Sequence, residues 1–186
     1  MRTINKEYHE TALNEMIADC AKTQKKGLPF MAASVILWLG IGIVQLTSLE
    51  IGLRNLITFC VSPLLMPLAL LFAHFMHVKI ADKTNPLSKA GFLFTLNQLL
   101  YLLIVMWVYS ERPEGMVMAF AIVHAAHMLP FSWLYRSISY RIAAIAGAAI
   151  ALILGILTTP AVVAFFVFGM QIALVISLSR EVKSEA

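Results

Sequence analysis

The chain has 186 residues, of which 60% are hydrophobic and 13% are charged, and its formal net charge is +4. A soluble domain is typically about half apolar and about a quarter charged, so this composition excludes an ordinary soluble protein. It predicts one compact domain that crosses a membrane several times. No nucleic-acid partner is expected, because the basic residues lie in short stretches between apolar segments.

Residues 1–27 are polar but periodic. Apolar side chains recur at helical spacing, among them Ile4, Tyr8, Met16 and Cys20, while most charged residues fall elsewhere around the helix. The pattern predicts an amphipathic helix that lies on the membrane surface or against the inner face of the protein. A plain surface helix that leads into the membrane domain fits the same pattern.

Six apolar segments follow, and each is close to the ~20 residues that a membrane-spanning helix needs. They cover about 28–46, 56–78, 90–109, 116–135, 142–157 and 161–178. The fold class predicted is an all-α bundle of six transmembrane helices over residues 28–179, followed by a short tail over 180–186. Pro63 and Pro67 predict a bend in the second segment, because each proline removes a helical hydrogen bond.

The basic residues orient these segments. If the N-terminus is cytoplasmic, only Arg54 and Arg112 of the 14 Lys and Arg residues fall in outside loops. The inside residues are Arg2, Lys6, Lys22, Lys25, Lys26, Lys79, Lys83, Lys89, Arg136, Arg141, Arg180 and Lys183. The positive-inside rule therefore predicts that both termini are cytoplasmic, with the protein in the inner (plasma) membrane and the lipid bilayer as its partner.

The fifth segment carries small residues at every fourth position. Ala143, Gly147, Ala151 and Gly155 share one face of the predicted helix. Small residues at this spacing let two helices approach closely. The face fits close packing inside the bundle, and it also fits a homo-oligomer formed through Gly147, Ala151 and Gly155.

Polar side chains on three segments fall at one depth. At a rise of 1.5 Å per residue, they lie about 12–18 Å from the inner charges of their own helices. This polar layer consists of Asn97, Gln98, Tyr101, His124, His127 and Gln171. Lipid cannot satisfy such groups, so we expect them to face one another or a small wet cavity that could bind a ligand. We expect His127 to contact Asn97, Gln98 or Gln171, directly or through water.

Two His-x-x-His pairs, His74 with His77 and His124 with His127, raise the question of a metal or haem cofactor, which the sequence does not require. Histidines at i, i+3 can chelate one ion, and imidazole suits Zn, Fe, Cu or Ni. The first pair lies at least about 6 Å nearer the inner charges than His127 does, by helical rise. A single four-histidine site is therefore not expected, and a hydrogen-bonded histidine network is the alternative.

Carboxylates are missing from all six apolar segments. The Asp and Glu relay that many ion transporters use inside the membrane is therefore not predicted. No nucleophile elbow, P-loop or HExxH motif appears either, so no catalytic residue is assigned.

Three stretches, NQLLYLLIVMWVY, HAAHMLPFSWLY and HFMHVKIADKTNPL, carry a resemblance to a known group of proteins. Over about residues 63–141 the chain resembles an uncharacterised family of small six-helix bacterial membrane proteins. The resemblance implies this topology and no activity. In size and topology the chain is also similar to the substrate-capture subunits of energy-coupling vitamin transporters, but those hold their ligand in the outer half of the membrane.

These features favour a small permease or ligand-binding membrane protein that uses the polar layer as its site. Two other classes stay open. One is a non-catalytic assembly or regulatory protein, in which the layer only fixes the register of the helices. The other is a membrane enzyme assisted by a metal or haem that the histidines hold.

The predicted topology can be tested with reporter fusions. A fusion at Ala186 and a fusion at Glu111 should report opposite sides of the membrane, because three predicted helices separate the two positions. A result that places both fusions on one side would contradict the six-helix topology.

Overall fold

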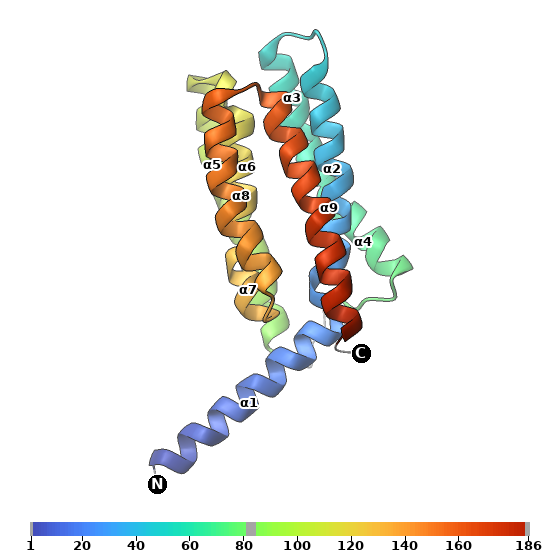
Figure 1. Ribbon diagram of the computed structural model, residues 1–186, viewed down its shortest axis with the longest axis vertical. Coiled ribbons are helices and arrows are strands. Elements are labelled where there is room, and N and C mark those ends of the chain that lie inside the picture. The colour runs from blue at the N-terminus through green and yellow to red at the C-terminus, as the bar shows by residue number, and fades with distance from the viewer. Residues whose placement is uncertain (1, 81–84, 185–186) are drawn as a thin grey trace.

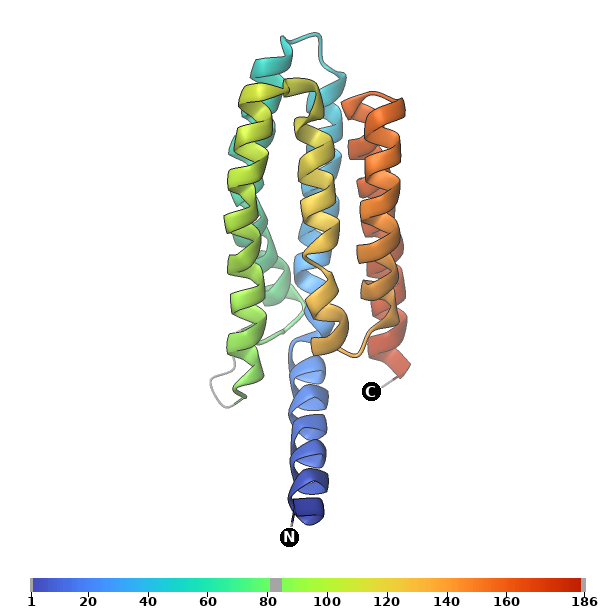
Figure 2. The ribbon, with the colours of Figure 1, turned by 90° about the vertical axis from the view of Figure 1, so that its left-hand side faces the viewer.

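The computed structural model of the protein describes residues 2–80 and 85–184, with side chains from Lys6 onward. Lys83, residues 185–186 and the side chain of Ile4 lie outside this described part. Within it, a helix, α1 (Arg2–Thr23), leads into six helical spans that are long and apolar enough to cross a membrane. The spans run side by side along the long axis, which confirms the predicted all-α fold class of membrane-spanning type (Figures 1 and 2).

The six spans comprise α-helices and short 3₁₀ turns, which are labelled η. The first contains η1 (Lys25–Gly27) and α2 (Leu28–Leu46), and the second contains α3 (Ile51–Val61), η2 (Ser62–Leu64) and α4 (Leu65–Phe75). The third is α5 (Leu87–Glu111), and the fourth contains η3 (Pro113–Gly115), α6 (Met116–Ala126) and α7 (Leu129–Leu134). The last two are α8 (Ile138–Leu157) and α9 (Pro160–Ser184), so the predicted tail is helical as far as Ser184.

The predicted bend in the second span is confirmed. α3 ends at Val61, a 3₁₀ turn contains Pro63, and α4 then starts on a new axis. Proline has no N–H to donate and its ring clashes with the preceding turn, so the regular helix stops there. α4 packs on α2 and swings outward from the neighbouring spans (Figure 1).

The fourth span is also broken, which the sequence analysis did not predict. It treated residues 116–135 as one helix, but α6 ends at Ala126 and α7 begins at Leu129. Pro130 explains the interruption, because its ring clashes with the carbonyl one turn earlier and it cannot donate a hydrogen bond. The break changes the direction of His127 relative to His124, which matters for the site.

The small-residue face of α8 packs inside the chain. A Cβ added to Gly147 would overlap Met170 Sδ on α9 and lie 3.3 Å from Ala125 Cβ on α6, and one added to Gly155 would overlap Met118. Close packing within the bundle, one of the two expectations for this face, is therefore what the structure shows. A homo-oligomer through Gly147, Ala151 and Gly155 would need that face to be free, and α6 and α9 already occupy it.

A buried ion pair fastens the end of the bundle next to α1, called the α1 end below. Lys26 is only 2% exposed, and its Nζ lies 3.1 Å from Glu181 Oε2. Glu181 Oε1 accepts hydrogen bonds from Ser137 Oγ at 3.0 Å and from Ser139 Oγ at 2.5 Å. The Tyr140 hydroxyl donates to the Lys26 carbonyl at 2.8 Å. The first, fifth and sixth spans are thus tied together at this end.

Only the last turns of α1 pack against the bundle. Ile17, Cys20 and Ala21 are buried, whereas Tyr8 is 70% exposed and Leu13 is also exposed. The helix therefore projects away from the six spans (Figure 2). Its predicted place on the membrane surface stays a prediction.

The packing of α8 can be tested with a matched pair of glycine substitutions. Gly147→Leu should lower the free energy of unfolding in detergent by about 1–3 kcal/mol, because it forces extra volume between tightly packed helices. Gly169→Leu is the control, since a Cβ at Gly169 meets nothing within 4 Å. Equal unfolding free energies for the two variants would mean that α8 does not pack as described.

Candidate functional site

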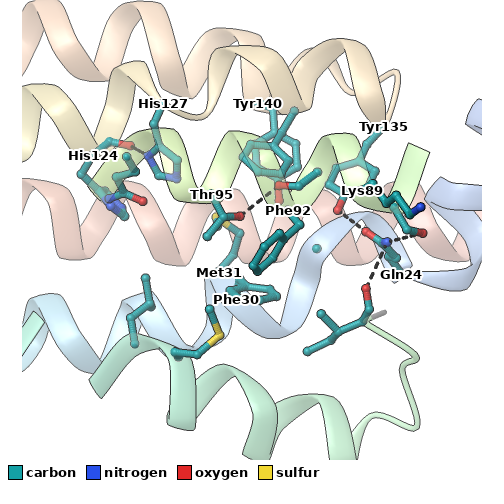
Figure 3. Close-up of a pocket in the computed structure, with 18 residues that line it drawn as sticks. Gln24, Phe30, Met31, Lys89, Phe92, Thr95, His124, His127, Tyr135 and Tyr140 are labelled. Carbon is teal, nitrogen blue, oxygen red and sulfur yellow. Dashed lines mark hydrogen bonds between the residues drawn. The ribbon is translucent and has the colours of Figure 1, made fainter. Parts of the chain in front are cut away.

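A cavity of about 360 Å³ lies between α2, α4, α5 and the fourth span, in the half of the bundle nearest α1 (Figure 3). Its wall is mostly apolar and includes Phe30, Met31, Leu65, Phe92 and Phe131. Its volume falls in the range of about 300–1,000 Å³ that is typical of small-molecule sites.

Polar side chains gather at the two ends of the cavity (Figure 3). At the end nearest α1, the Tyr135 hydroxyl donates to Gln24 Oε1 at 2.7 Å, and Gln24 Nε2 donates to Ser88 Oγ at 3.1 Å. Lys89 lines the same end. His124 and His127 stand at the opposite, deeper end (Figure 3).

Three fully buried side chains meet at His124. Its Nε2 lies 2.6 Å from Gln171 Nε2 and 3.2 Å from Ser34 Oγ. An amide and a hydroxyl thus share the Nε2 position of His124. Ser34, His124 and Gln171, called the polar junction below, come from α2, α6 and α9, and they hydrogen-bond to one another where lipid cannot. Gln171 Oε1 is buried and has no hydrogen-bond partner among the described residues.

His127 is held by a different bond. Its Nδ1 lies 2.5 Å from the His124 carbonyl oxygen. That carbonyl is free because Met128 N–H donates to Ala125 O at 3.1 Å instead, at the break in the span. A carbonyl only accepts, so His127 Nδ1 carries the proton and Nε2 is left as an acceptor. His127 lines the cavity, and its Nε2 makes no hydrogen bond with any residue that the structure describes.

Gln98 brings a second polar group to the cavity, from α5. Its side chain is 9% exposed, and its amide has no hydrogen-bond partner within residues 6–80 and 85–184. Buried polar groups are nearly always hydrogen-bonded in native proteins. The amide of Gln98 and Nε2 of His127 are thus left to water or a ligand.

Two members of the predicted polar layer do not face the interior. Asn97 and Tyr101 are exposed on the outer side of α5, where Asn97 Nδ2 donates to the Tyr101 hydroxyl at 2.9 Å. Their expected inward placement is wrong, because Gln98 is the residue that turns to the bundle and Asn97 lies about 100° away around the helix. They satisfy each other instead of joining the layer.

The direct form of the expected contact between His127 and an amide is absent from residues 6–80 and 85–184, and a contact through water with Gln98 stays a prediction. Gln171 bonds directly to His124, and His127 turns onto the backbone of its own span. The depths predicted for His124, His127 and Gln171 agree with the structure. The break before Pro130 turns His127 onto the backbone, so His124 is the histidine that contacts Gln171. The sequence analysis did not include Ser34 in the polar layer. The same depth argument could have found it, because Ser34 lies 8 residues after Lys26, about 12 Å into the membrane by helical rise.

The histidines of the second span stand apart from the cavity. His74 is exposed on α4, and His77 follows the helix end, exposed and with a left-handed backbone (φ 52°). No three His, Cys, Asp or Glu side chains come together anywhere in the described chain. A metal ion shared by His124 and His127 would have to compete for Nε2 of His124, which already forms hydrogen bonds.

Six apolar spans, three of them joined through the buried polar junction, define an integral membrane protein of the helical-bundle class. The chain belongs to a family described as being of unknown function (DUF7010), whose model matches residues 13–181 and so includes all six spans apart from the last turn of α9. A comparison with curated proteins and a comparison with solved structures each found no match to the chain.

The polar junction can be tested by a double-mutant cycle. His124→Leu should lower the free energy of unfolding by about 1–3 kcal/mol, because it leaves the Gln171 amide buried without a partner. His124→Leu combined with Gln171→Leu should cost less than the sum of the two single changes. Asn97→Leu serves as the control for loss of a polar side chain at an exposed position. Strict additivity of the two changes, measured by unfolding in detergent, would contradict the junction.

Proposed function

We propose that the protein binds a small molecule with a largely apolar body in the cavity, as a ligand-binding membrane protein or small permease. The observation that carries the proposal is the pair Gln98 and His127. An amide and an imidazole nitrogen without partners among the described residues line a mostly apolar cavity of ligand-sized volume. Such a site typically fixes the orientation of a ligand through a few convergent polar groups.

The polar junction separates this proposal from a purely structural role. Ser34, His124 and Gln171 already fix the register of three helices through their own hydrogen bonds. Gln98 and His127 Nε2 add nothing to that register. An assembly or regulatory protein would need only the junction, so the unpaired groups on the cavity support ligand binding.

Transport would require more of this structure than ligand binding does, because a transported ligand must also leave on the far side of the membrane. Beyond the polar junction, the bundle is closed by a packed core in which the rings of Trp38 and Phe120 stack at 5.2 Å, surrounded by Leu37, Val105 and Val163. A ligand in the cavity could cross to the far side only if this core moved. In this conformation the cavity can therefore bind a ligand from one side only. A permease would need a second conformation in which the cavity opens to the other side.

The same proposal includes the orientation. Because twelve of the 14 basic residues fall in the segments predicted to be inside, we take the α1 end to be cytoplasmic, which puts the cavity in the inner half of the plasma membrane. α1 then lies on the cytoplasmic side near the inner membrane surface, and both termini are inside.

Recovery of a bound molecule tests the proposal. Protein purified in nanodiscs is extracted, and the extract is compared with that of empty nanodiscs by mass spectrometry. Wild-type protein should yield a molecule at near-stoichiometric amount, and Gln98→Leu or His127→Phe should reduce its recovery several-fold, because each removes a polar contact in the cavity. Asn97→Leu, an exposed amide on the same helix as Gln98, should leave recovery unchanged. Equal recovery from all four proteins, or none from the wild type, would contradict ligand binding in this cavity.

A further inference from the structure

The cavity opens sideways, between α4 and α5. Its wall includes Met66 on α4, which is 40% exposed, and Phe92 on α5, which is 58% exposed. Residues that line the cavity and also reach the outer surface mark where it is open. The opening exists because the 3₁₀ turn at Pro63 directs α4 outward and onto α2. Both residues belong to apolar spans, so the opening faces the acyl chains of a bilayer.

The mouth of the cavity carries one unpaired positive charge. Lys89 is the single charged residue among the described residues that line the cavity, and it is exposed at the end nearest α1 (Figure 3). Neither ion pair found in the described chain involves it. Other basic residues, among them Lys26, Arg136 and Arg180, stand at the same end of their spans, so this is also where the membrane surface is expected to lie.

Polar groups thus stand at both ends of an apolar middle. The cation Lys89 lies at the surface end, His127 lies at the deep end, and Phe30, Met31 and Phe92 lie between them (Figure 3). Gln98 lines the cavity nine residues after Lys89 on α5, which is about 14 Å further along the helix. A wholly apolar ligand would leave the deep polar groups without partners. A small water-soluble anion would leave the apolar middle empty.

Resting on the function proposed above, we propose that the ligand is a single-chain anionic amphiphile taken laterally from the bilayer. It enters between α4 and α5 with its anionic head at Lys89. Its chain lies along the apolar middle, and a hydroxyl or similar polar group near the far end of the chain binds to Gln98 and His127. A volume of about 360 Å³ accommodates one short chain but not a whole two-chain phospholipid.

The proposal is tested by equilibrium binding to the full chain in nanodiscs of zwitterionic lipid, with empty nanodiscs as background. Four probes separate the contributions: ω-hydroxydodecanoate, dodecanoate, dodecane-diol and hydroxybutyrate. ω-Hydroxydodecanoate should bind most tightly. Dodecanoate lacks the far hydroxyl, dodecane-diol lacks the anion and hydroxybutyrate lacks the long chain, so each should bind more weakly.

Variants assign each contribution to a residue. Lys89→Gln should weaken the binding of ω-hydroxydodecanoate by roughly tenfold or more, as expected for a hydrogen bond to a charged group. It should leave dodecane-diol unaffected. His127→Phe should abolish the preference for ω-hydroxydodecanoate over dodecanoate. Lys79→Gln is the matched control, since Lys79 is an exposed lysine in the loop after α4 and is not part of the cavity wall.

The outcomes also separate this inference from the function on which it rests. Tight binding of hydroxybutyrate would show that the ligand comes from water and overturn lateral uptake. Equal affinity for dodecane-diol, unchanged by Lys89→Gln, would overturn the anionic head while leaving ligand binding in place. Failure of all four probes would overturn the proposed ligand class, and the recovery of a bound molecule by extraction would then decide separately whether the cavity binds anything.

Discussion

The hydrogen bonds of His124 hold three helices in register inside the bilayer, where the lipid chains offer no competing hydrogen-bond partners. In water, the hydrophobic effect would drive these helices together, but in a bilayer the lipid chains are as apolar as the helices themselves. Packing and buried polar contacts must then supply the specificity. Ser34 and Gln171 reach His124 Nε2 from α2 and α9, so any sliding of one helix would leave a polar group unpaired in hydrocarbon. The cavity depends on this junction because His124 itself lines the deep end of the cavity.

The two histidines of the fourth span have different roles, although they are only three residues apart. His124 lies within regular α6 and faces α2 and α9, where it is 1% exposed. His127 lies at the break, where its Nδ1 takes up a carbonyl that the helix no longer uses. One break in the backbone thus satisfies a freed carbonyl and leaves an imidazole nitrogen directed to the cavity. The ring centroids remain 5.3 Å apart, so the structural and the ligand-facing group are direct neighbours.

Much of the architecture could be predicted from the sequence because membrane spans obey strong local rules. Length and apolar content defined six spans, Pro63 located the bend in the second, and helical rise placed His124, His127 and Gln171 at one depth. Rotation about each helix axis was harder, as the outward placement of Asn97 and Tyr101 shows, because an apolar residue such as Leu96 or Leu100 can face lipid or protein equally well. The cavity itself could not be predicted. It arises from how far α4 leaves the bundle after Pro63, which is set by tertiary packing and not by a local pattern.

The ion pair at the α1 end links the beginning of the membrane domain to its end. Lys26 and Glu181 are 155 positions apart in the chain, yet they form a bond that buries the lysine almost completely. During synthesis, Lys26 is made near the start of the first span and Glu181 only near the end of the sixth. This ion pair, next to the left-handed turn at Lys26 and Gly27, can therefore form only after the sixth span has been made.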